Sequence, residues 1–168
     1  MRTTKRTPAG DGLSSLMLDL FRVNSLLLTA GDRLVAGLGL TSARWQILGA
    51  IVTGERPQPV AWLARNLGGN RQNVQRIIND LHQEGLVGFE ANPHHRRAQL
   101  VVLTDKGRQT FEAAMRLQAP WVNALADGLL AKDIETVHRV ITALREKLAG
   151  NDEAAAPWLG RRDTAVAG

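Results

Sequence analysis

The sequence predicts a mainly α-helical protein of about six helices with one small β-hairpin. Two observations lead to this prediction. Apolar residues repeat at helical spacing along most of the 168 residues, and 44% of all residues are hydrophobic, which is enough for a packed core. Residues 86–91 and 99–103 differ, because they are short apolar runs on either side of a turn that contains Pro93. These two runs are expected to pair as antiparallel strands.

The N-terminal part of the chain is predicted to be a short arm followed by one long helix. Residues 1–11 are polar and include basic side chains, so we expect a disordered basic arm. Residues 12–36 carry an apolar stripe at helical spacing that is wider than one neighbouring helix can cover. A second copy of the chain is the simplest cover, so this segment is predicted to be a dimerisation helix.

Residues 41–103 are predicted to form the next domain, which begins with two helices. Thr41 is expected to cap the first of them, and residues 53–59 are expected to form a loop. Pro59 then begins a short helix, because the first turn of a helix needs no N–H at that position. The glycine pair at 68–69 ends this helix and turns the chain.

The helix after this turn has one apolar face and one unusual polar face. Asn70 is expected to cap it, and its core face carries Val74, Ile77, Ile78 and Leu81. The polar face has no acidic residue before Asp80, and it consists of Arg71, Gln72, Asn73, Gln75, Arg76 and Asn79. Arginine pairs with guanine, and asparagine or glutamine pairs with adenine, in the major groove of DNA. This face therefore predicts contact with DNA, whereas an ordinary solvated face usually mixes Glu and Lys.

The predicted hairpin follows that helix directly and has a basic tip, which consists of His94, His95, Arg96 and Arg97. A hairpin directly after a helix-turn-helix is a wing, so the fold class is a winged helix-turn-helix. Positive charge at the tip of a wing suits contact with phosphates or with the minor groove. A solvated loop is the alternative interpretation of the two arginines.

The order of these motifs resembles the MarR family of bacterial transcription regulators. The resemblance covers about residues 13–149 and rests on the helix-turn-helix, on Asn-Pro-x-x-Arg-Arg at 92–97 and on Leu-Thr-Asp-Lys-Gly at 103–107. It implies a homodimer that binds palindromic operators, with residues 70–76 in the major groove and Arg97 as the arginine of the wing. The family usually has Asp two residues before that arginine, where this chain has His95.

The resemblance also implies that a small aromatic or anionic effector relieves DNA binding. In the family such a ligand lies where the dimerisation helices meet the DNA-binding domain. Carried over to this chain, that place is expected to be lined by Phe21, Arg44, Trp45, Phe111 and Met115. For each apolar residue of this set, an ordinary position in the core is the alternative.

Residues 104–149 are predicted to contain the C-terminal helices that complete the dimerisation region. Thr104 is expected to cap a long helix, and Pro120 is expected to kink or break it near residue 119. The last helix carries a second apolar stripe that matches the stripe of the first helix. Residues 150–168 are expected to be a flexible tail.

Composition and motifs exclude several classes of function. The chain has no cysteine, which excludes disulfides, thiolate metal sites and cysteine redox switches. The histidine spacing is not that of a metal site, and no phosphate loop or zinc-protease motif occurs, so we expect no metal, cofactor or catalysis. No run reaches the roughly 18 apolar residues of a membrane span, so we expect a cytoplasmic protein without a membrane partner. The net charge of +5 favours a polyanionic partner.

The predicted function is therefore that of a transcription regulator that binds double-stranded DNA. We expect a homodimeric repressor that recognises a palindromic operator and is released by a small ligand. The alternative is a winged-helix module that contacts protein or RNA without recognising an operator.

Overall fold

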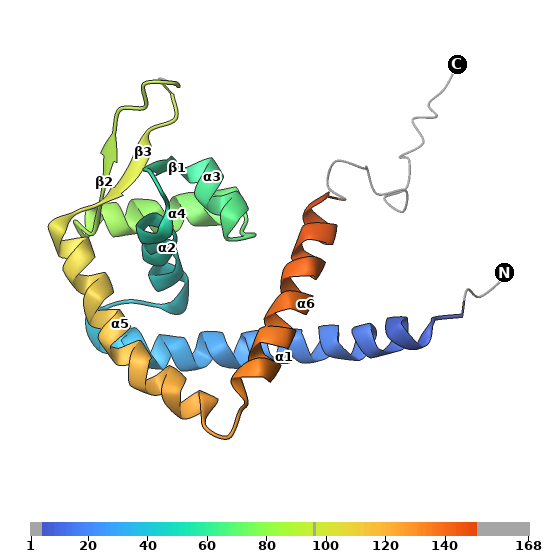
Figure 1. Ribbon diagram of the computed structural model, residues 1–168. Helices are drawn as coiled ribbons and strands as arrows, with labels where there is room; N and C mark the ends of the chain where they lie inside the picture. Colours follow the sequence, from blue (N-terminus) through green and yellow to red (C-terminus); the bar gives the residue numbers. More distant parts are fainter. Residues whose placement is uncertain (1–4, 96, 151–168) are drawn as a thin grey trace, which may run out of the picture. The chain divides into compact units, whose positions relative to one another are not determined.

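The computed structural model describes residues 5–95 and 97–150, which form six α-helices and a small antiparallel sheet (Figure 1). In chain order the elements are α1 (Pro8–Val35), the 3-10 turn η1 (Ala36–Leu38), α2 (Ser42–Thr53), β1 (Gln58–Pro59), α3 (Val60–Asn66), α4 (Arg71–Gln83), β2 (Val87–Glu90), β3 (Leu100–Leu103), α5 (Asp105–Ala126) and α6 (Ala131–Gly150). The prediction of a mainly α-helical protein with a winged helix-turn-helix is confirmed. The chain divides after Trp121 into two compact units, and each is described by itself.

The wing is a hairpin that gains a third strand at its edge. The strand order is β1-β3-β2, and both pairs are antiparallel, with Val87 opposite Leu103 and Gln58 opposite Val101. The prediction of a loop throughout residues 53–59 is therefore wrong at its end. Pro59 is tolerated in β1 because this strand lies at the edge of the sheet, where a missing N–H need not break a ladder.

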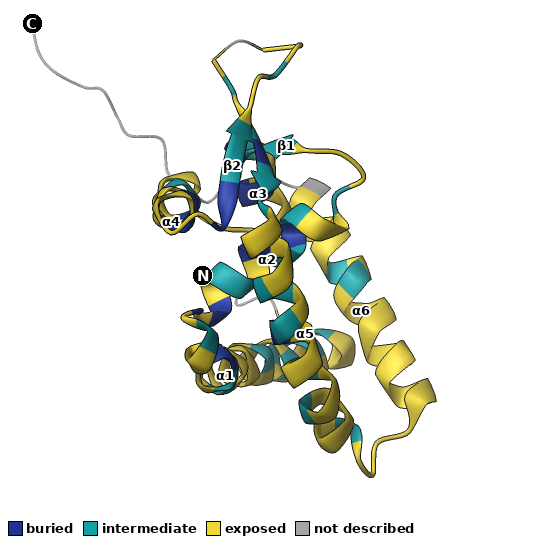
Figure 2. Cartoon of the chain, turned by 90° about the vertical axis from the view of Figure 1, so that its left-hand side faces the viewer, coloured by how far each residue is buried: buried dark blue, intermediate teal, exposed yellow. Residues whose placement is uncertain are grey.

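The hydrophobic core lies where α2, α3 and α4 pack against one another and against the sheet. Its largest fully buried side chains include Ile47 and Leu48 of α2, Leu63 of α3, and Ile78 and Leu81 of α4. Figure 2 shows these buried parts in dark blue at the centre of the winged domain, and the helices α1 and α6 are mainly exposed. The core therefore holds the polar face of α4 in a fixed orientation.

The first helix begins earlier than the sequence predicted. Residues 8–11 belong to α1, so the prediction of a disordered arm is wrong for them, and residues 1–4 lie outside the described part of the chain. Thr7 is the N-cap, and its side-chain oxygen accepts a hydrogen bond from Gly10 N at 3.1 Å. Pro8 at the first helical position and Asp11 in the first turn both favour this start, for steric and electrostatic reasons.

The long helix α5 is continuous through Pro120, so the predicted kink or break near residue 119 is not a break, and the kink stays a prediction. A proline removes its own N–H bond to the carbonyl four residues earlier and its ring crowds that carbonyl, but the hydrogen bonds on either side can keep the helix continuous. The second unit contains the end of α5 and the helix α6. Its exposed apolar residues include Ile134, Val137, Ile141 and Leu148. The predicted tail lies outside the described residues from position 151 onward.

The segment Pro8–Leu38 is long and apolar enough to cross a membrane by length and composition, with a mean hydropathy of 1.3 in its most apolar window. No uninterrupted run of 18 apolar residues occurs in this segment, because Asp19 and Arg22 lie within it. The helix also carries the charged residues Asp19, Arg22, Asp32 and Arg33. An apolar stripe of this kind is also what a helix needs to pack against another protein chain.

Gly107 provides a test of how α5 is seated on the winged domain. It is buried, and an added Cβ would overlap the backbone carbonyl of Leu86. We expect Gly107→Ala to lower the free energy of unfolding by about 1–3 kcal/mol, because backbone must move to make room. Urea denaturation followed by circular dichroism measures this difference.

Gly12→Ala is the matched control, because a Cβ at this exposed position of α1 meets no atom within 4 Å. Alanine in a helix is favoured over glycine by up to about 1 kcal/mol, so this variant should be at least as stable as the unchanged protein. Equal stability of the two variants would contradict the close approach of α5 to Leu86.

Candidate nucleic-acid interface

The start of α4 is defined by a sharp turn and a side-chain cap. Gly68 has a φ of 63°, a left-handed conformation that glycine adopts without strain. The side-chain oxygen of Asn70 accepts hydrogen bonds from Gln72 N at 2.8 Å and from Asn73 N at 3.3 Å. Asn70 is the N-cap that the sequence predicted, and its side-chain oxygen is already bonded to backbone N–H groups of the first turn. Its contribution to a DNA contact would therefore come through the helix it begins.

The buried face of α4 consists of the four residues that the sequence assigned to the core, Val74, Ile77, Ile78 and Leu81. The opposite side of the helix is therefore the side that faces solvent. By helical spacing, Gln72, Arg76 and Asn79 project furthest from the core, while Arg71 and Asn73 flank them. All five of these side chains are exposed, and Gln75 is half-buried.

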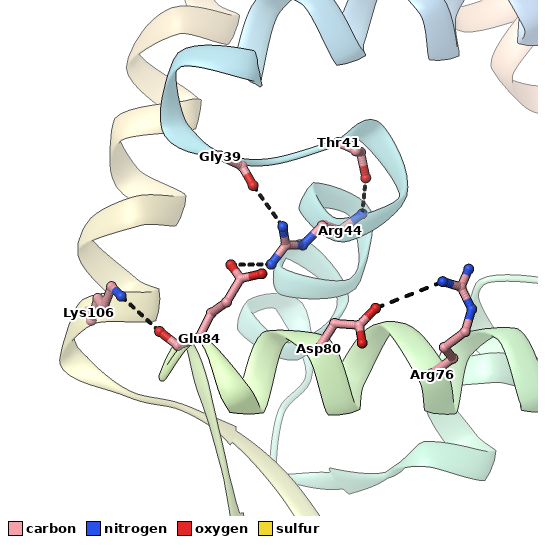
Figure 3. Close-up of polar contacts among 7 residues, drawn as sticks. All are labelled: Gly39, Thr41, Arg44, Arg76, Asp80, Glu84 and Lys106. Atoms are coloured by element: carbon pink, nitrogen blue, oxygen red, sulfur yellow. Dashed lines mark hydrogen bonds and ion pairs between the residues drawn. The ribbon is translucent and has the colours of Figure 1, made fainter.

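Several of these polar side chains hold one another in place. The Gln75 amide donates to Asn79 Oδ1 at 2.9 Å, and Arg76 Nη2 donates to Asn73 Oδ1 at 3.0 Å. Arg76 also lies 3.9 Å from the carboxylate of Asp80, an exposed pair that contributes little to stability (Figure 3). The helix thus presents amides and a guanidinium in a partly ordered arrangement, which are the groups that recognise base edges in the major groove.

The loop of the wing is closed by an asparagine whose role the sequence did not reveal. Asn92 Nδ2 donates to the carbonyl of Ala98 at 2.9 Å, and Asn92 Oδ1 accepts from His94 N at 2.9 Å. His94, His95 and Arg97 are exposed, while Arg96 lies outside the described residues. The Asn-Pro pair was the available signal, because an asparagine side chain commonly hydrogen-bonds the backbone two residues later.

Arg44 joins three parts of the winged domain (Figure 3). Its side chain is 17% exposed, donates to the carbonyl of Gly39 at 2.8 Å and forms an ion pair with Glu84 at the end of α4. The backbone carbonyl of Glu84 also accepts a hydrogen bond from Lys106 Nζ of α5 at 2.8 Å. The guanidinium therefore connects the segment after α1, the first turn of α2 and the C-terminus of α4.

A cavity of about 400 Å³ lies between α1, α2 and the middle of α5. It is lined by Asn24, Leu27, Leu28, Gly31, Ser42, Trp45, Gln46, Gly49, Phe111, Met115, Gln118 and Trp121. Of the five residues that the family resemblance suggested for a ligand site, Trp45, Phe111 and Met115 meet at this cavity. Arg44 is turned to Glu84 instead, and Phe21 is 68% exposed on α1.

The described residues of this site do not bring a set of metal ligands together. No group of three or more His, Asp or Glu side chains that could hold a metal ion occurs within residues 5–95 and 97–150. What the polar face of α4 and the wing can do is bind through hydrogen bonds and positive charge. The N-terminus of α4, with its aligned backbone dipoles, adds to the attraction for an anion such as a phosphate.

Comparison with known proteins places this geometry in a family. A model described as the MarR family matches residues 38–98, the segment from η1 to the wing. An uncharacterized protein of Mycobacterium tuberculosis is 37% identical over 139 residues, which are 80% of this chain and 96% of that protein. The transcriptional activatory protein BadR of Rhodopseudomonas palustris is 30% identical over 144 residues, 83% of this chain and 82% of BadR.

The fold itself recurs in a solved structure with much lower sequence identity. The crystal structure of CouR from Rhodococcus jostii, bound to p-coumaroyl-CoA, matches with a TM-score of 0.69 and 18% identity. The match covers 77% of this chain and 90% of CouR.

Arg97 offers a test of the wing. If it contacts a phosphate, Arg97→Ala should weaken binding to every duplex and lower the slope of log K against log salt by about 0.9. Affinities measured by fluorescence anisotropy at several salt concentrations give both quantities. Arg22→Ala, which removes the same charge from α1, is the control and should leave the slope unchanged. An unchanged slope for Arg97→Ala would remove the wing from the interface.

Proposed function

Because the chain belongs to the MarR family of transcription regulators, we propose that it is a homodimeric repressor that binds a palindromic operator and leaves it when a small ligand binds. The observation that carries this proposal is the polar face of α4, which is exposed because its opposite face is buried in the core. DNA binding and regulation of transcription are properties of the family, while the operator, the sign of regulation and the ligand are parts of the proposal.

In the proposed complex, α4 enters the major groove with its N-terminal residues nearest the bases. Gln72 and Gln75 can recognise adenine, and Arg76 can recognise guanine through two parallel hydrogen bonds. Arg97 is exposed at the tip of the wing, where it can contact the adjacent phosphates. The exposed side chains of His94 and His95 can do the same. Phosphate contacts set the position of the protein, and the contacts of α4 set its sequence preference.

A second copy of this chain is the proposed cover of α1. Met17, Leu18, Phe21, Val23 and Leu26 are each at least 43% exposed, with Leu26 at 70%. Large apolar side chains in this number are rarely left to water on one helix of a soluble protein. A two-fold dimer presents two α4 helices, and such dimers bind inverted repeats with half-sites about 34–36 Å apart. A membrane is the other cover that the length of α1 allows. A dimer in the cytoplasm also gives the exposed polar face of α4 a role, because it presents two such faces to DNA.

Ligand control follows from how α2 is tied to its neighbours. Ser42 of α2 donates its hydroxyl to the carbonyl of Leu28 at 2.7 Å, and its N–H donates to Asp32 Oδ1 at 2.6 Å. Arg44, two residues later, holds Glu84 at the end of α4. A ligand that separates α1 from α2 would therefore move α4, and DNA affinity would fall by the ligand's preference for the displaced form. The ligand bound to CouR supports a small-molecule effector.

The sign of regulation differs in one relative, because BadR is a transcriptional activatory protein. Repression requires only that the bound dimer cover a promoter. Activation would also require a contact with the transcription machinery. A reporter gene behind the bound DNA distinguishes the two, because deletion of this protein raises expression in the first case and lowers it in the second.

The proposed DNA recognition is tested with the duplex that lies upstream of the protein's own gene. At a fixed salt concentration near 0.15 M, we expect this duplex to bind about a thousandfold more tightly than a scrambled duplex of the same composition. Single-stranded RNA of the same length is a second competitor and should bind no better than scrambled DNA. Tighter binding to the RNA would contradict operator recognition and favour a winged-helix module of another kind.

A further inference from the structure

The cavity between α1, α2 and α5 is lined by aromatic and amide side chains. Trp45, Phe111 and Trp121 provide flat apolar surfaces, and Met115 adds an adaptable thioether. The polar part comes largely from the amides of Asn24, Gln46 and Gln118. Among the residues that the structure describes, none that lines this cavity carries a charge.

Two charged groups that neighbour lining residues in the sequence are engaged elsewhere. Arg44 precedes Trp45, but its guanidinium binds Gly39 and Glu84 (Figure 3). Asp32 follows Gly31, and its carboxylate accepts the N–H of Ser42 at 2.6 Å. The hydroxyl of Ser42 is itself bound to the carbonyl of Leu28. A carboxylate ligand would therefore find no cation among the lining residues, and Asp32 directly follows the lining residue Gly31.

These observations favour a neutral ligand over a carboxylate. A carboxylate that leaves water for an apolar cavity without a counter-ion loses more free energy than a neutral amide does. A side-chain amide both donates and accepts, so three amides can match a neutral group that does the same. A volume of about 400 Å³ is within the range of small-molecule sites.

We propose that this cavity binds an uncharged planar aromatic compound that carries a carboxamide or a similar neutral polar group, and that it discriminates against aromatic carboxylates. The proposal rests on the proposed function, in which this cavity is the effector site. It narrows the effector from an aromatic or anionic compound to a neutral aromatic one.

Matched pairs of probes test the charge preference on the full-length protein. Benzamide and benzoate, cinnamamide and cinnamate, and 2-naphthamide and 2-naphthoate differ within each pair mainly in the ionised oxygen at pH 7.5. Binding is followed by tryptophan fluorescence, since Trp45 and Trp121 line the cavity, and by calorimetry. We expect at least one amide to bind roughly tenfold or more tightly than its carboxylate.

A charge placed at the cavity should reverse this preference. Gln46 is exposed at the edge of the lining, so Gln46→Lys provides a counter-ion with little effect on the core. We expect the carboxylates to gain roughly tenfold in affinity in this variant. Gln109→Lys adds the same charge to an exposed position of α5 outside the lining and should leave both affinities unchanged.

The inference is overturned if a carboxylate binds the unchanged protein as tightly as its amide. It is also overturned if no probe of the panel binds at low-millimolar concentration. Duplex binding is measured separately on the same preparation. A preference for amides without any duplex preference would leave the ligand class standing and reject the proposed operator recognition.

Discussion

The burial of one face of α4 is the constraint on which the rest of this structure depends. Ile78 and Leu81 are fully buried, and Val74 is 4% exposed, so the rotation of the helix about its axis is fixed. A shift of one residue, about 100° of rotation, would carry apolar side chains into water at about 1.5–3 kcal/mol each. The cost of such a rotation keeps the opposite face turned outward, and this face carries Gln72, Arg76 and Asn79. The recognition surface is thus a consequence of the core.

A second constraint links this helix to the rest of the winged domain. Arg44 is a charged group with a largely buried side chain, and such groups are tolerated where partners compensate for the loss of water. Its partners are Gly39, at the segment after α1, and Glu84, at the end of α4. Ser42 fixes the start of α2 to α1 by two further hydrogen bonds. A change at the α1–α2 contact therefore has a short path of direct contacts to the recognition helix.

The sequence predicted those parts of the fold that depend on local signals. The cap at Asn70, the apolar spacing of α4 and the turn at Gly68 are all encoded within a few residues, and the structure has them as predicted. It could not predict β1, because that strand exists only through its pairing with β3. The start of α1 differs from the prediction for another reason, because Thr7 and Pro8 are a local start signal that lies within an otherwise polar segment.

The same distinction between local signals and long-range contacts applies to the site residues. The exposure of the residues on α4 could be predicted from helical spacing, because the buried face identifies the outward one. The position of Arg44 could not, since its partner Glu84 lies 40 residues further along the chain and is brought near by packing. The role of Asn92 in the wing loop depends on contacts within six residues and was open to prediction from its type.

The most direct test of the central claim is a selection of bound fragments from a pool of random-sequence duplexes. If the outward face of α4 reads base edges and two copies act together, the enriched fragments should share an inverted repeat. The centres of its half-sites should lie about 10–10.5 base pairs apart, or at a multiple of that distance. An enriched pool without any shared sequence would show that the protein binds DNA only through its charge, and it would contradict the role given to α4.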